Sequence, residues 1–235
     1  MLELVDKVKD NLESVYSEIA DAAAECGRDS GEITVMAVTK THPAEYIAAA
    51  VECGIRHIGE NRVSEGGRKI KELGKDYAVF HAIGVLHRKE VRQALRDFHW
   101  LDAVDKIEII EEIARRKASP QILLEVNTSG EEAKMGFPPD VVLLESVLGR
   151  ALELELPVQG FLTVGPLCRD LSGQRKAFED LRVLRDSLET RLSVSLPELS
   201  MGMSDDFALA VKEGATTVRL GRRLFGYRKT CQVNL

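Results

Sequence analysis

The chain has 235 residues, of which 44% are hydrophobic and 30% charged, a balance that is typical of one compact domain and excludes a disordered or fibrous protein. Its formal net charge of −6 would repel a phosphate backbone, so we expect no nucleic-acid partner. The first residues lack a basic segment before an apolar one, and no run reaches the roughly 18 apolar residues of a membrane span, so we expect a cytoplasmic protein without membrane contact.

A lead-in helix is predicted within residues 1–30. From Leu2 to about Cys26, apolar residues recur at helical spacing with charged residues between them, and Gly27 follows as a stop signal. From residue 31 to residue 226 the pattern changes to short apolar runs, each followed by a longer helical stretch. Residues 227–235 then form a short tail.

This alternation predicts eight strands with helices between them. The predicted strands are Ile33–Lys40, His57–Asn61, Ala78–Gly84, Trp100–Asp105, Gln121–Asn127, Pro157–Gly165, Glu198–Met203 and Thr217–Gly221. The predicted helices include Ala44–Cys53, His87–Arg96, Lys106–Arg116, Val141–Leu152, Gln174–Leu192 and Asp205–Glu213. Glycines at positions 54, 74 and 214 stand near helix ends.

The strands are nearly continuous apolar runs, which is typical of a parallel sheet covered by helices on its faces. Eight units of this length predict an α/β fold made of one eight-stranded parallel β/α barrel of the TIM type, with an extra N-terminal helix. An open, doubly wound sheet would show the same alternation, and only the number of units favours closure. No linker divides the chain, so we interpret residues 1–235 as a single domain, although the segment after Gly221 is too short for a full last helix.

Residues suited to binding stand at the ends of several predicted strands, where parallel barrels place their working face. They are Lys40, Asn61, Asn127, Thr163, Ser204, Arg219 and Gly221. Lys40 follows a buried apolar run, and burial disfavours the charged form of an amine, so Lys40 could act as a nucleophile toward carbonyl compounds. The alternative is a lysine that only extends into solvent at the end of a strand.

Ser204 and Gly221 stand after the last two predicted strands. Ser204 opens the segment SDDFALA, which predicts a helix N-cap followed by acidic residues in the first turn. The same place in a β/α barrel, next to the turn around Gly221, is where such barrels bind phosphate. Gly221 could equally be a turn residue with no ligand.

Arg219 lies within the last predicted strand, and we expect its guanidinium to point into the barrel mouth rather than at the outer helices. A buried permanent cation needs a partner, which is either a ligand or a carboxylate such as Glu60. Cys53, His57 and His81 are single residues at element ends, and we interpret them as core groups rather than ligands.

The cysteines predict neither a disulfide framework nor a metal site. The chain has four of them, widely spaced, without a paired Cys-x-x-Cys and without a histidine in ligand spacing. We interpret them as buried or incidental thiols; they are Cys26, Cys53, Cys168 and Cys231.

Several segments taken together resemble the pyridoxal phosphate homeostasis proteins, the single-domain relatives of the alanine racemase barrel. The segments are AVTKTHP (37–43), GENRV (59–63), SMGMSDD (200–206), and VRLG (218–221) with LFG (224–226). Each segment is a weak signal alone, but their joint appearance in this order is specific. The resemblance runs from the lead-in helix to Gly226, which is nearly the whole chain.

The resemblance implies pyridoxal 5′-phosphate as the cofactor, bound in an eight-stranded β/α barrel. It implies that Lys40 forms a Schiff base with the cofactor and that Asn61 lines the pocket. It further implies that Ser204 and the backbone amides around Gly221 and Arg222 hold the phosphate. Arg219 would face the pyridine nitrogen, and because an arginine keeps its proton, it would weaken the electron sink that most enzymes using this cofactor depend on.

The sequence also departs from the family pattern. In the third unit the family usually has His-Phe-Ile-Gly, then Leu-Gln and Asn-Lys, whereas this chain has HAIGVLHRKE at residues 81–90. No family role is therefore transferred to His87, Arg88 or Lys89. Arg222 replaces a small or hydroxyl residue, so a hydroxyl contact to phosphate is lost while the backbone N–H remains.

The leading hypothesis is a carrier, buffer or regulator that binds pyridoxal phosphate on Lys40 and delivers it to apo-enzymes, as a monomer or weak dimer, with no catalytic residue. Alanine racemases of this kind need an added β domain that supplies a tyrosine, and only residues 227–235 follow Gly226, so we expect a binding protein rather than an enzyme. One alternative is a slow amino-acid racemase that uses Lys40 alone as acid and base. Another is a class I aldolase, in which Lys40 forms its Schiff base with a sugar phosphate.

Overall fold

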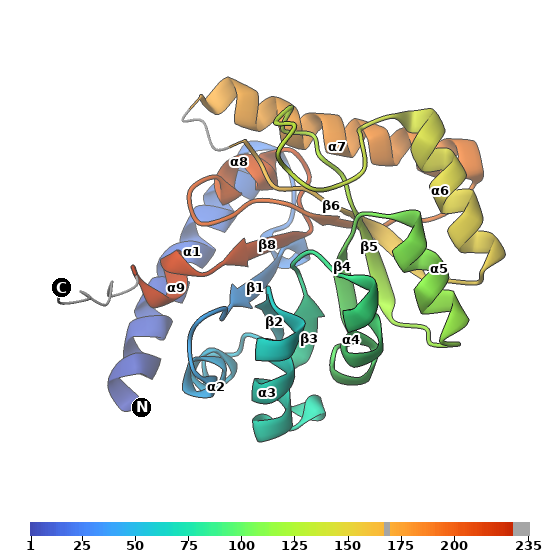
Figure 1. Ribbon diagram of the computed structural model, residues 1–235. Coiled ribbons are helices and arrows are strands. Elements are labelled where there is room, and N and C mark those ends of the chain that lie inside the picture. The colour runs from blue at the N-terminus through green and yellow to red at the C-terminus, as the bar shows by residue number, and fades with distance from the viewer. Residues whose placement is uncertain (167–169, 228–235) are drawn as a thin grey trace, which may run out of the picture.

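The computed structural model describes residues 1–166 and 170–227, and these form a closed barrel of eight parallel strands with helices around it (Figure 1). The strands are β1 (Thr34–Val38), β2 (His57–Glu60), β3 (Val79–Ala82), β4 (Trp100–Val104), β5 (Gln121–Glu125), β6 (Val158–Leu162), β7 (Glu198–Ser200) and β8 (Thr217–Leu220). The barrel closes because β8 pairs with β1, with Thr217 beside Thr34 and Leu220 beside Ala37. The predicted barrel is confirmed, and the open sheet is excluded.

Every predicted strand is present, and each is shorter than its prediction. The sixth strand was expected at Pro157–Gly165 and is found at Val158–Leu162. The apolar pattern continues past the last paired residue because the residues that directly follow several strands are buried as well. Met201, just beyond β7, is fully buried although it is not in a strand.

The helices follow the strands in the expected alternation. They are α1 (Leu2–Glu25), α2 (Ala44–Glu52), α3 (Val63–Leu73), α4 (Val91–Asp97), α5 (Ile107–Arg115), α6 (Val141–Glu153), α7 (Leu171–Leu192), α8 (Phe207–Lys212) and α9 (Arg222–Phe225). Short 3-10 turns lie at Ser30–Glu32, Lys75–Tyr77 and Arg88–Glu90. The predicted helix His87–Arg96 is therefore a 3-10 turn followed by α4.

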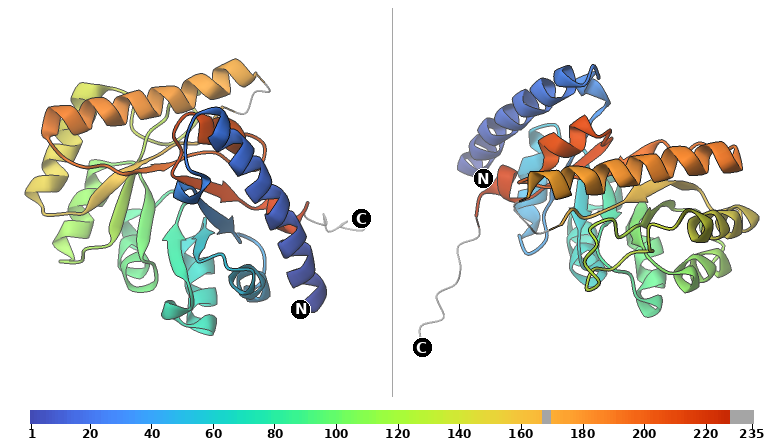
Figure 2. Two further views of the ribbon diagram at one scale, coloured as in Figure 1. Left: turned by 180° about the vertical axis from the view of Figure 1, so that it is seen from behind. Right: turned by 90° about the horizontal axis from the view of Figure 1, so that it is seen from above.

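The lead-in helix α1 covers the side of the barrel where the last unit is short. The helix α9 after β8 has only 4 residues, and α1 lies alongside α8 and α9 (Figure 2). Lys7 Nζ donates to Phe225 O at 2.8 Å, and Asn11 Nδ2 donates to Leu224 O at 2.8 Å. These side chains satisfy carbonyl groups at the end of α9 that have no partner within so short a helix.

Helix α1 is held to the barrel by one apolar face. Val8, Leu12, Val15 and Ile19 recur at intervals of three or four residues and are buried, which is the spacing of one side of a helix. The remaining positions of α1 carry many charged residues. Within residues 1–166 and 170–227, no helix combines the length and apolar character needed to span a membrane.

The predicted tail, residues 227–235, lies outside the described residues except for Tyr227, and so do Cys168 and Cys231. Of the other two cysteines, Cys26 is an exposed thiol and Cys53 is half-buried.

Candidate functional site

The carboxyl ends of β7, β8, β1 and β2 bring the predicted binding residues to one side of the barrel mouth. Parallel strands end on the same face, and these strands are consecutive neighbours in the closed sheet. Gly221 follows β8 and packs against the end of β1, where a Cβ added to Gly221 would lie 3.3 Å from Val38 O. The turn at Gly221 therefore lies beside the segment that leads into Lys40.

Lys40 lies in a turn just beyond β1 and is half-buried. The residue before it, Thr39, is fully buried. The residue after it, Thr41, has a φ of 66°, a left-handed conformation that is uncommon for a β-branched residue. Lys40 thus lies in a turn at the mouth whose next residue has a left-handed backbone conformation.

Arg219 is buried, with 4% of its surface exposed, and its guanidinium lies inside the barrel as predicted. Nη1 donates to Ser200 O at 2.6 Å and to Ser200 Oγ at 2.9 Å, and Nη2 donates to Thr163 O at 2.7 Å. The alternative of a pair with Glu60 is wrong, because the Glu60 carboxylate accepts from Lys69 and Thr39 instead. The cation is therefore fixed by the ends of β6 and β7.

Three buried carboxylates balance the charge of Arg219 without a direct hydrogen bond to it among the described residues. Burial lowers the pKa of Arg219, and the negative charges of Asp102, Asp206 and Glu125 raise it. Burial in turn raises the pKa of Glu125 and of Asp206, while Arg219 opposes the shift in both. The interior beneath the mouth is thus polar, and the charge of its buried arginine is offset by three buried carboxylates.

Ser204 has a different role from the predicted helix cap. Helix α8 begins at Phe207, not at residue 205, and Asp206 stands at its N-cap, with Oδ1 accepting from Met203 N at 2.5 Å. The Asp206 carboxylate closes this turn, which leaves the Ser204 hydroxyl to accept from Arg223 N at 3.3 Å. Ser204 therefore joins the loop after β7 to the loop after β8.

Arg222 and Asn61 lie at the rim of the mouth. The Arg222 side chain is exposed, pairs with Asp205, and lies over the Tyr227 ring at 5.6 Å from its centroid. The arginine side chain is therefore engaged at the surface, and the backbone is the part of Arg222 closest to the Gly221 turn. Asn61 is exposed, and a Cβ added to Gly84 would lie 2.1 Å from Asn61 O, so Gly84 allows the segment after β3 to pass close to Asn61.

The sequence analysis missed a buried ion cluster below the mouth. Lys69 Nζ lies 2.7 Å from Glu60 Oε1 and 2.8 Å from Glu65 Oε1. The spacing of Glu65 and Lys69, one helical turn apart, was the available signal, but such a pair is usually on the surface. The helix that carries it, α3, had no predicted range, although its end at Gly74 was expected.

The opposite end of the barrel, its floor, carries a second polar chain. His57 Nδ1 lies 2.9 Å from His81 Nε2, and His81 Nδ1 lies 2.9 Å from Asp102 Oδ2. The interpretation of His57 and His81 as hydrogen-bonded core groups agrees with these contacts. They line a cavity of about 30 Å³, enough for a water molecule but not for a cofactor.

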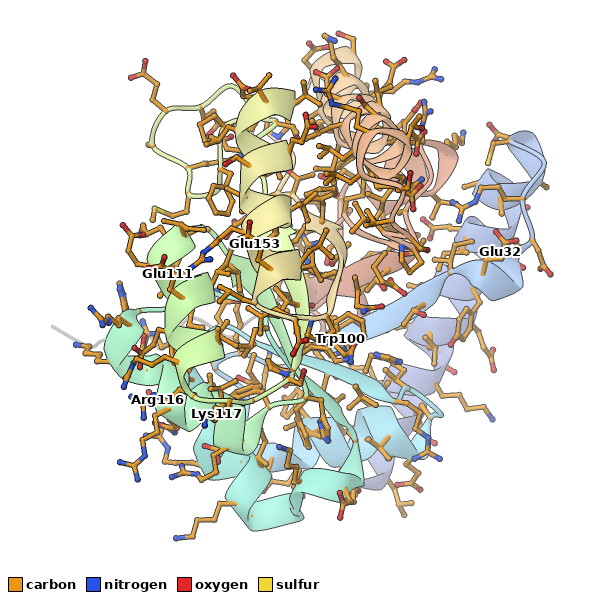
Figure 3. All side chains as sticks on the ribbon, turned by 90° about the vertical axis from the view of Figure 1, so that its right-hand side faces the viewer. Glu32, Trp100, Glu111, Arg116, Lys117 and Glu153 are labelled. Carbon is orange, nitrogen blue, oxygen red and sulfur yellow. The ribbon has the colours of Figure 1, made fainter. Side chains whose placement is uncertain are left out.

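A wider groove lies outside the barrel, between α5 and α6. It has a volume of about 480 Å³, and Figure 3 shows Glu111 on one of its helices and Glu153 on the other. Arg115 and Arg150 also line it, and the predicted binding residues do not. Among residues 1–166 and 170–227, no group of three or more His, Cys, Asp or Glu side chains is placed to hold a metal ion.

The groups at the mouth fit the polar parts of pyridoxal phosphate. Lys40 carries an amine for its aldehyde, Ser204 a hydroxyl for its phosphate, and Arg219 a buried cation for its ring nitrogen. Gly221 adds a backbone turn that leaves little room for a side chain beside Val38. The residues thus come together in an arrangement that suits this cofactor.

Comparisons with known proteins point to the same group. The family described as "Alanine racemase, N-terminal domain" matches residues 11–229. The pyridoxal phosphate homeostasis protein of Aquifex aeolicus is 36% identical over 225 residues, which are 94% of this chain and 98% of that protein. The structure of PipY from Synechococcus elongatus PCC7942 with pyridoxal phosphate bound is 31% identical, with a TM-score of 0.79, over 93% of this chain and 100% of that one.

Alanine racemase itself shares the fold at lower similarity. The structure from Clostridium difficile 630 has a TM-score of 0.74 at 13% identity, over 96% of this chain and 58% of that chain. Identity this low shows a shared barrel and no more.

Proposed function

Because this chain belongs to the family of the alanine racemase N-terminal domain, and to the pyridoxal phosphate homeostasis proteins within it, we propose that it binds pyridoxal 5′-phosphate covalently on Lys40 and acts as a carrier, buffer or regulator of that cofactor. The observation that carries this proposal is the convergence of Lys40, Ser204, Gly221 and Arg219 at one side of the barrel mouth. The structure of PipY with pyridoxal phosphate bound covers nearly all of this chain, which supports binding of the same cofactor.

Lys40 supplies the covalent link. The cofactor, when bound, would supply an aldehyde, and the Lys40 amine would condense with it to a Schiff base with release of one water molecule. Lys40 is half-buried and directly follows fully buried Thr39, so it stands at the edge of the barrel interior.

The phosphate is held by Ser204 and by the backbone amides at Gly221 and Arg222, with Asn61 at the rim. The contact of the Ser204 hydroxyl with the Arg223 backbone N–H supports this assignment, because it draws the loops after β7 and β8 together. The hydroxyl can donate to a phosphate oxygen while it accepts from that N–H. The Arg222 side chain pairs with Asp205 at the surface, so only the backbone of Arg222 is assigned to the phosphate.

Arg219 faces the pyridine nitrogen and keeps its own proton. The cofactor, when bound, supplies an electron sink, and a ring nitrogen opposite a permanent cation stays unprotonated and makes that sink weaker. Three hydrogen bonds hold the guanidinium in place, and an arginine side chain keeps its proton, so Arg219 would not act as an acid or base. This arrangement supports binding and release of the cofactor rather than turnover, and we assign no catalytic residue.

The deciding experiment is the visible absorbance of the purified protein mixed with pyridoxal phosphate, before and after borohydride reduction. The wild type should show a Schiff-base band, and reduction should leave the cofactor on the peptide that contains Lys40. Lys40→Ala should lose the band, while Lys176→Ala, a change on the exposed face of α7, should retain it. A wild type without the band, or Lys40→Ala with the same band, would reject the proposal and favour the aldolase reading.

A slow racemase is the second candidate, favoured by the match to the alanine racemase domain. In this candidate Lys40 alone serves as acid and base. Loaded wild type incubated with L-amino acids would then form D-enantiomer at a rate well above that of Lys40→Ala. Equal rates in the wild type and Lys40→Ala would leave only the carrier role.

Delivery to apo-enzymes completes the proposed role, performed by one β/α barrel domain as a monomer or weak dimer. A cofactor trap, which removes free pyridoxal phosphate, is added to two samples of an apo-enzyme. The sample given the loaded protein should become active faster than the sample given the same amount of free cofactor. Sedimentation velocity at several protein concentrations measures the oligomeric state. A tight dimer at the lowest concentration would contradict that part of the proposal.

A further inference from the structure

We propose that buried Lys69, together with Glu60 and Glu65, positions the turn that carries Lys40, and so sets the direction in which the Lys40 amine meets the cofactor aldehyde. The inference rests on the proposed function of Lys40. We call the three residues the turn-holding cluster. None of them touches the cofactor in this proposal, so they act through the backbone on either side of Lys40.

Lys69 holds together three segments of the chain. Its Nζ donates to Thr39 O at 2.8 Å, to Glu60 Oε1 at 2.7 Å and to Glu65 Oε1 at 2.8 Å. These acceptors belong to the end of β1, the end of β2 and the first turn of α3. An ammonium group has three N–H donors, so the acceptors use all of them. Lys69 is therefore fixed by its own contacts, with 7% of its surface exposed.

Both peptide groups that flank Lys40 are bound to this cluster. The carbonyl of the preceding peptide group, Thr39 O, accepts from Lys69. The N–H of the following peptide group, Thr41 N, donates to Glu65 Oε1 at 2.5 Å. These peptide planes define the φ and ψ of Lys40, and hence the direction of its Cα–Cβ bond. The cluster thus holds the backbone of Lys40 from both sides.

The turn is closed by its own backbone hydrogen bond, from His42 N to Thr39 O at 3.1 Å, but one of its residues has an unfavourable conformation. Thr41 has a φ of 66°, which a β-branched residue disfavours, so surrounding contacts must hold it there. A second contact secures the other side, where Thr39 Oγ1 donates to Glu60 Oε1 at 2.5 Å. Backbone strain beside a reactive residue, held by half-buried Glu65 on one side and buried Glu60 on the other, is the arrangement expected of a positioned group.

A purely stabilising role explains the cluster less well. Buried ion pairs contribute little net stability, because the cost of removing both charges from water offsets their attraction. Glu60 also has a buried oxygen, Oε2, without a hydrogen-bond partner among the described residues, and burial raises the pKa of its carboxyl. An apolar contact would pack β1, β2 and α3 at lower cost, whereas only donors and acceptors can hold the peptide groups around Lys40.

The sharpest test compares Glu65→Gln with Glu65→Ala. The amide oxygen of glutamine can still accept from Thr41 N and Lys69 Nζ, whereas alanine cannot. We expect Glu65→Ala to slow formation of the Schiff-base band about tenfold and Glu65→Gln to stay within about twofold of the wild type, since small displacements of reacting groups slow reactions strongly. Equal rates in the two variants would overturn the inference.

Two readouts on the cofactor-free protein separate positioning from binding. In Glu65→Ala the Thr41 amide should exchange its hydrogen faster than in the wild type. The rate of reductive methylation of Lys40, relative to that of exposed Lys176, should also change. Glu65→Gln should match the wild type in both measurements. Lys69→Met should exceed Glu65→Ala in each effect if it folds. Unchanged exchange and methylation in Glu65→Ala would also overturn the inference.

The control is Glu112→Gln, which weakens another buried carboxylate cluster, with Arg115 and Arg116 on α5. It should change thermal stability without changing the reactivity of Lys40. If the wild type itself forms no Schiff base on Lys40, the proposed function fails. If the wild type forms it and all variants form it at the same rate, only the role of the cluster fails.

Discussion

The two ends of the barrel use buried polar groups in opposite ways. At the floor, His57, His81 and Asp102 bind one another in a chain of side chains. At the mouth, the buried cations Lys69 and Arg219 bind side chains too, but each also donates to backbone carbonyls, which are those of residues 39, 163 and 200. The floor groups therefore satisfy each other, whereas the mouth cations fix the chain around the proposed site. Burial alone does not distinguish these cases, but the identity of the hydrogen-bond partner does.

Asp102 connects the two ends. Its carboxylate accepts from His81 on the floor side, and its negative charge raises the pKa of Arg219 on the mouth side. Asp102 therefore contributes to the polar surroundings of both ends.

Replacing Arg219 by methionine should have the largest effect on this difference between the two ends. Thr163 O would lose its donor and Ser200 O would keep only Thr163 N, while three buried carboxylates would lose the cation that balances them. We expect the free energy of unfolding to fall by about 3–5 kcal/mol, measured by urea denaturation of the cofactor-free protein at pH 7.

The matched control for this prediction is Arg175→Met, which removes an exposed partner of buried Glu213 on the outer layer. It should change stability far less than Arg219→Met. Similar losses in the two variants would mean that the mouth cation is no more important to the fold than a surface ion pair.

Replacing Ser204 by alanine tests the mouth without removing a buried charge. The loss of a hydrogen bond to a charged phosphate should cost about 1.5–3 kcal/mol of binding free energy, which is roughly 10- to 150-fold in affinity for pyridoxal phosphate. Affinity for pyridoxal, which lacks the phosphate, should stay nearly constant. Titration of the Schiff-base band measures both, and an equal loss for both ligands would place Ser204 away from the phosphate.

The barrel could be predicted because burial of parallel strands on both faces leaves a direct mark in composition. The eight apolar runs, their order and the lead-in helix are all present. Helix α3 was harder, because Gly66 and Gly67 in its interior are poor helix formers. Gly66 is required by packing, since a Cβ there would lie 2.5 Å from Phe98 Cζ, and such a contact cannot be inferred from local sequence.

The sequence predicted where the residues of the candidate site lie, but not which hydrogen-bond partners they have. The ends of parallel strands share one face, so Lys40 and Arg219 could be assigned to the mouth. The partners of each side chain depend on the turns, as Ser204 shows: Asp206 takes the cap position, and Ser204 binds across to Arg223. The assignments of Lys40, Asn61, Ser204, Arg219, Gly221 and Arg222 to parts of the cofactor stay predictions.

At the floor, His57 offers a pH test that the mouth should not share. Burial and the neighbouring His81 lower the pKa of His57 to about 4, against the pull of Asp102. The folded protein then binds fewer protons than the unfolded chain, whose histidine has a pKa near 6.5. The contribution of neutral His57 is therefore complete above about pH 6.5 and is lost as the pH falls toward 4.

Denaturation of the wild type and His57→Gln at pH 7.5, 6.0, 5.0 and 4.5 measures this loss. The stability advantage of the wild type should shrink by about 1–2 kcal/mol across this range, after allowance for the partial exposure of the ring. The two proteins share the buried carboxyl groups, so their titration cancels in the difference. A constant difference would show that His57 is not held neutral by the fold.

The smallest expected effect lies outside both ends, at Gly149 in α6. No atom lies within 4 Å of a Cβ added there, and the position is inside a helix, where alanine is favoured over glycine. Gly149→Ala should stabilise the protein by about 0.5–1 kcal/mol in urea denaturation and leave the affinity for pyridoxal phosphate unchanged. A change in affinity would mean that stability of the outer layer reaches the mouth, and that the effects of Ser204→Ala and Glu65→Ala cannot be assigned to local contacts.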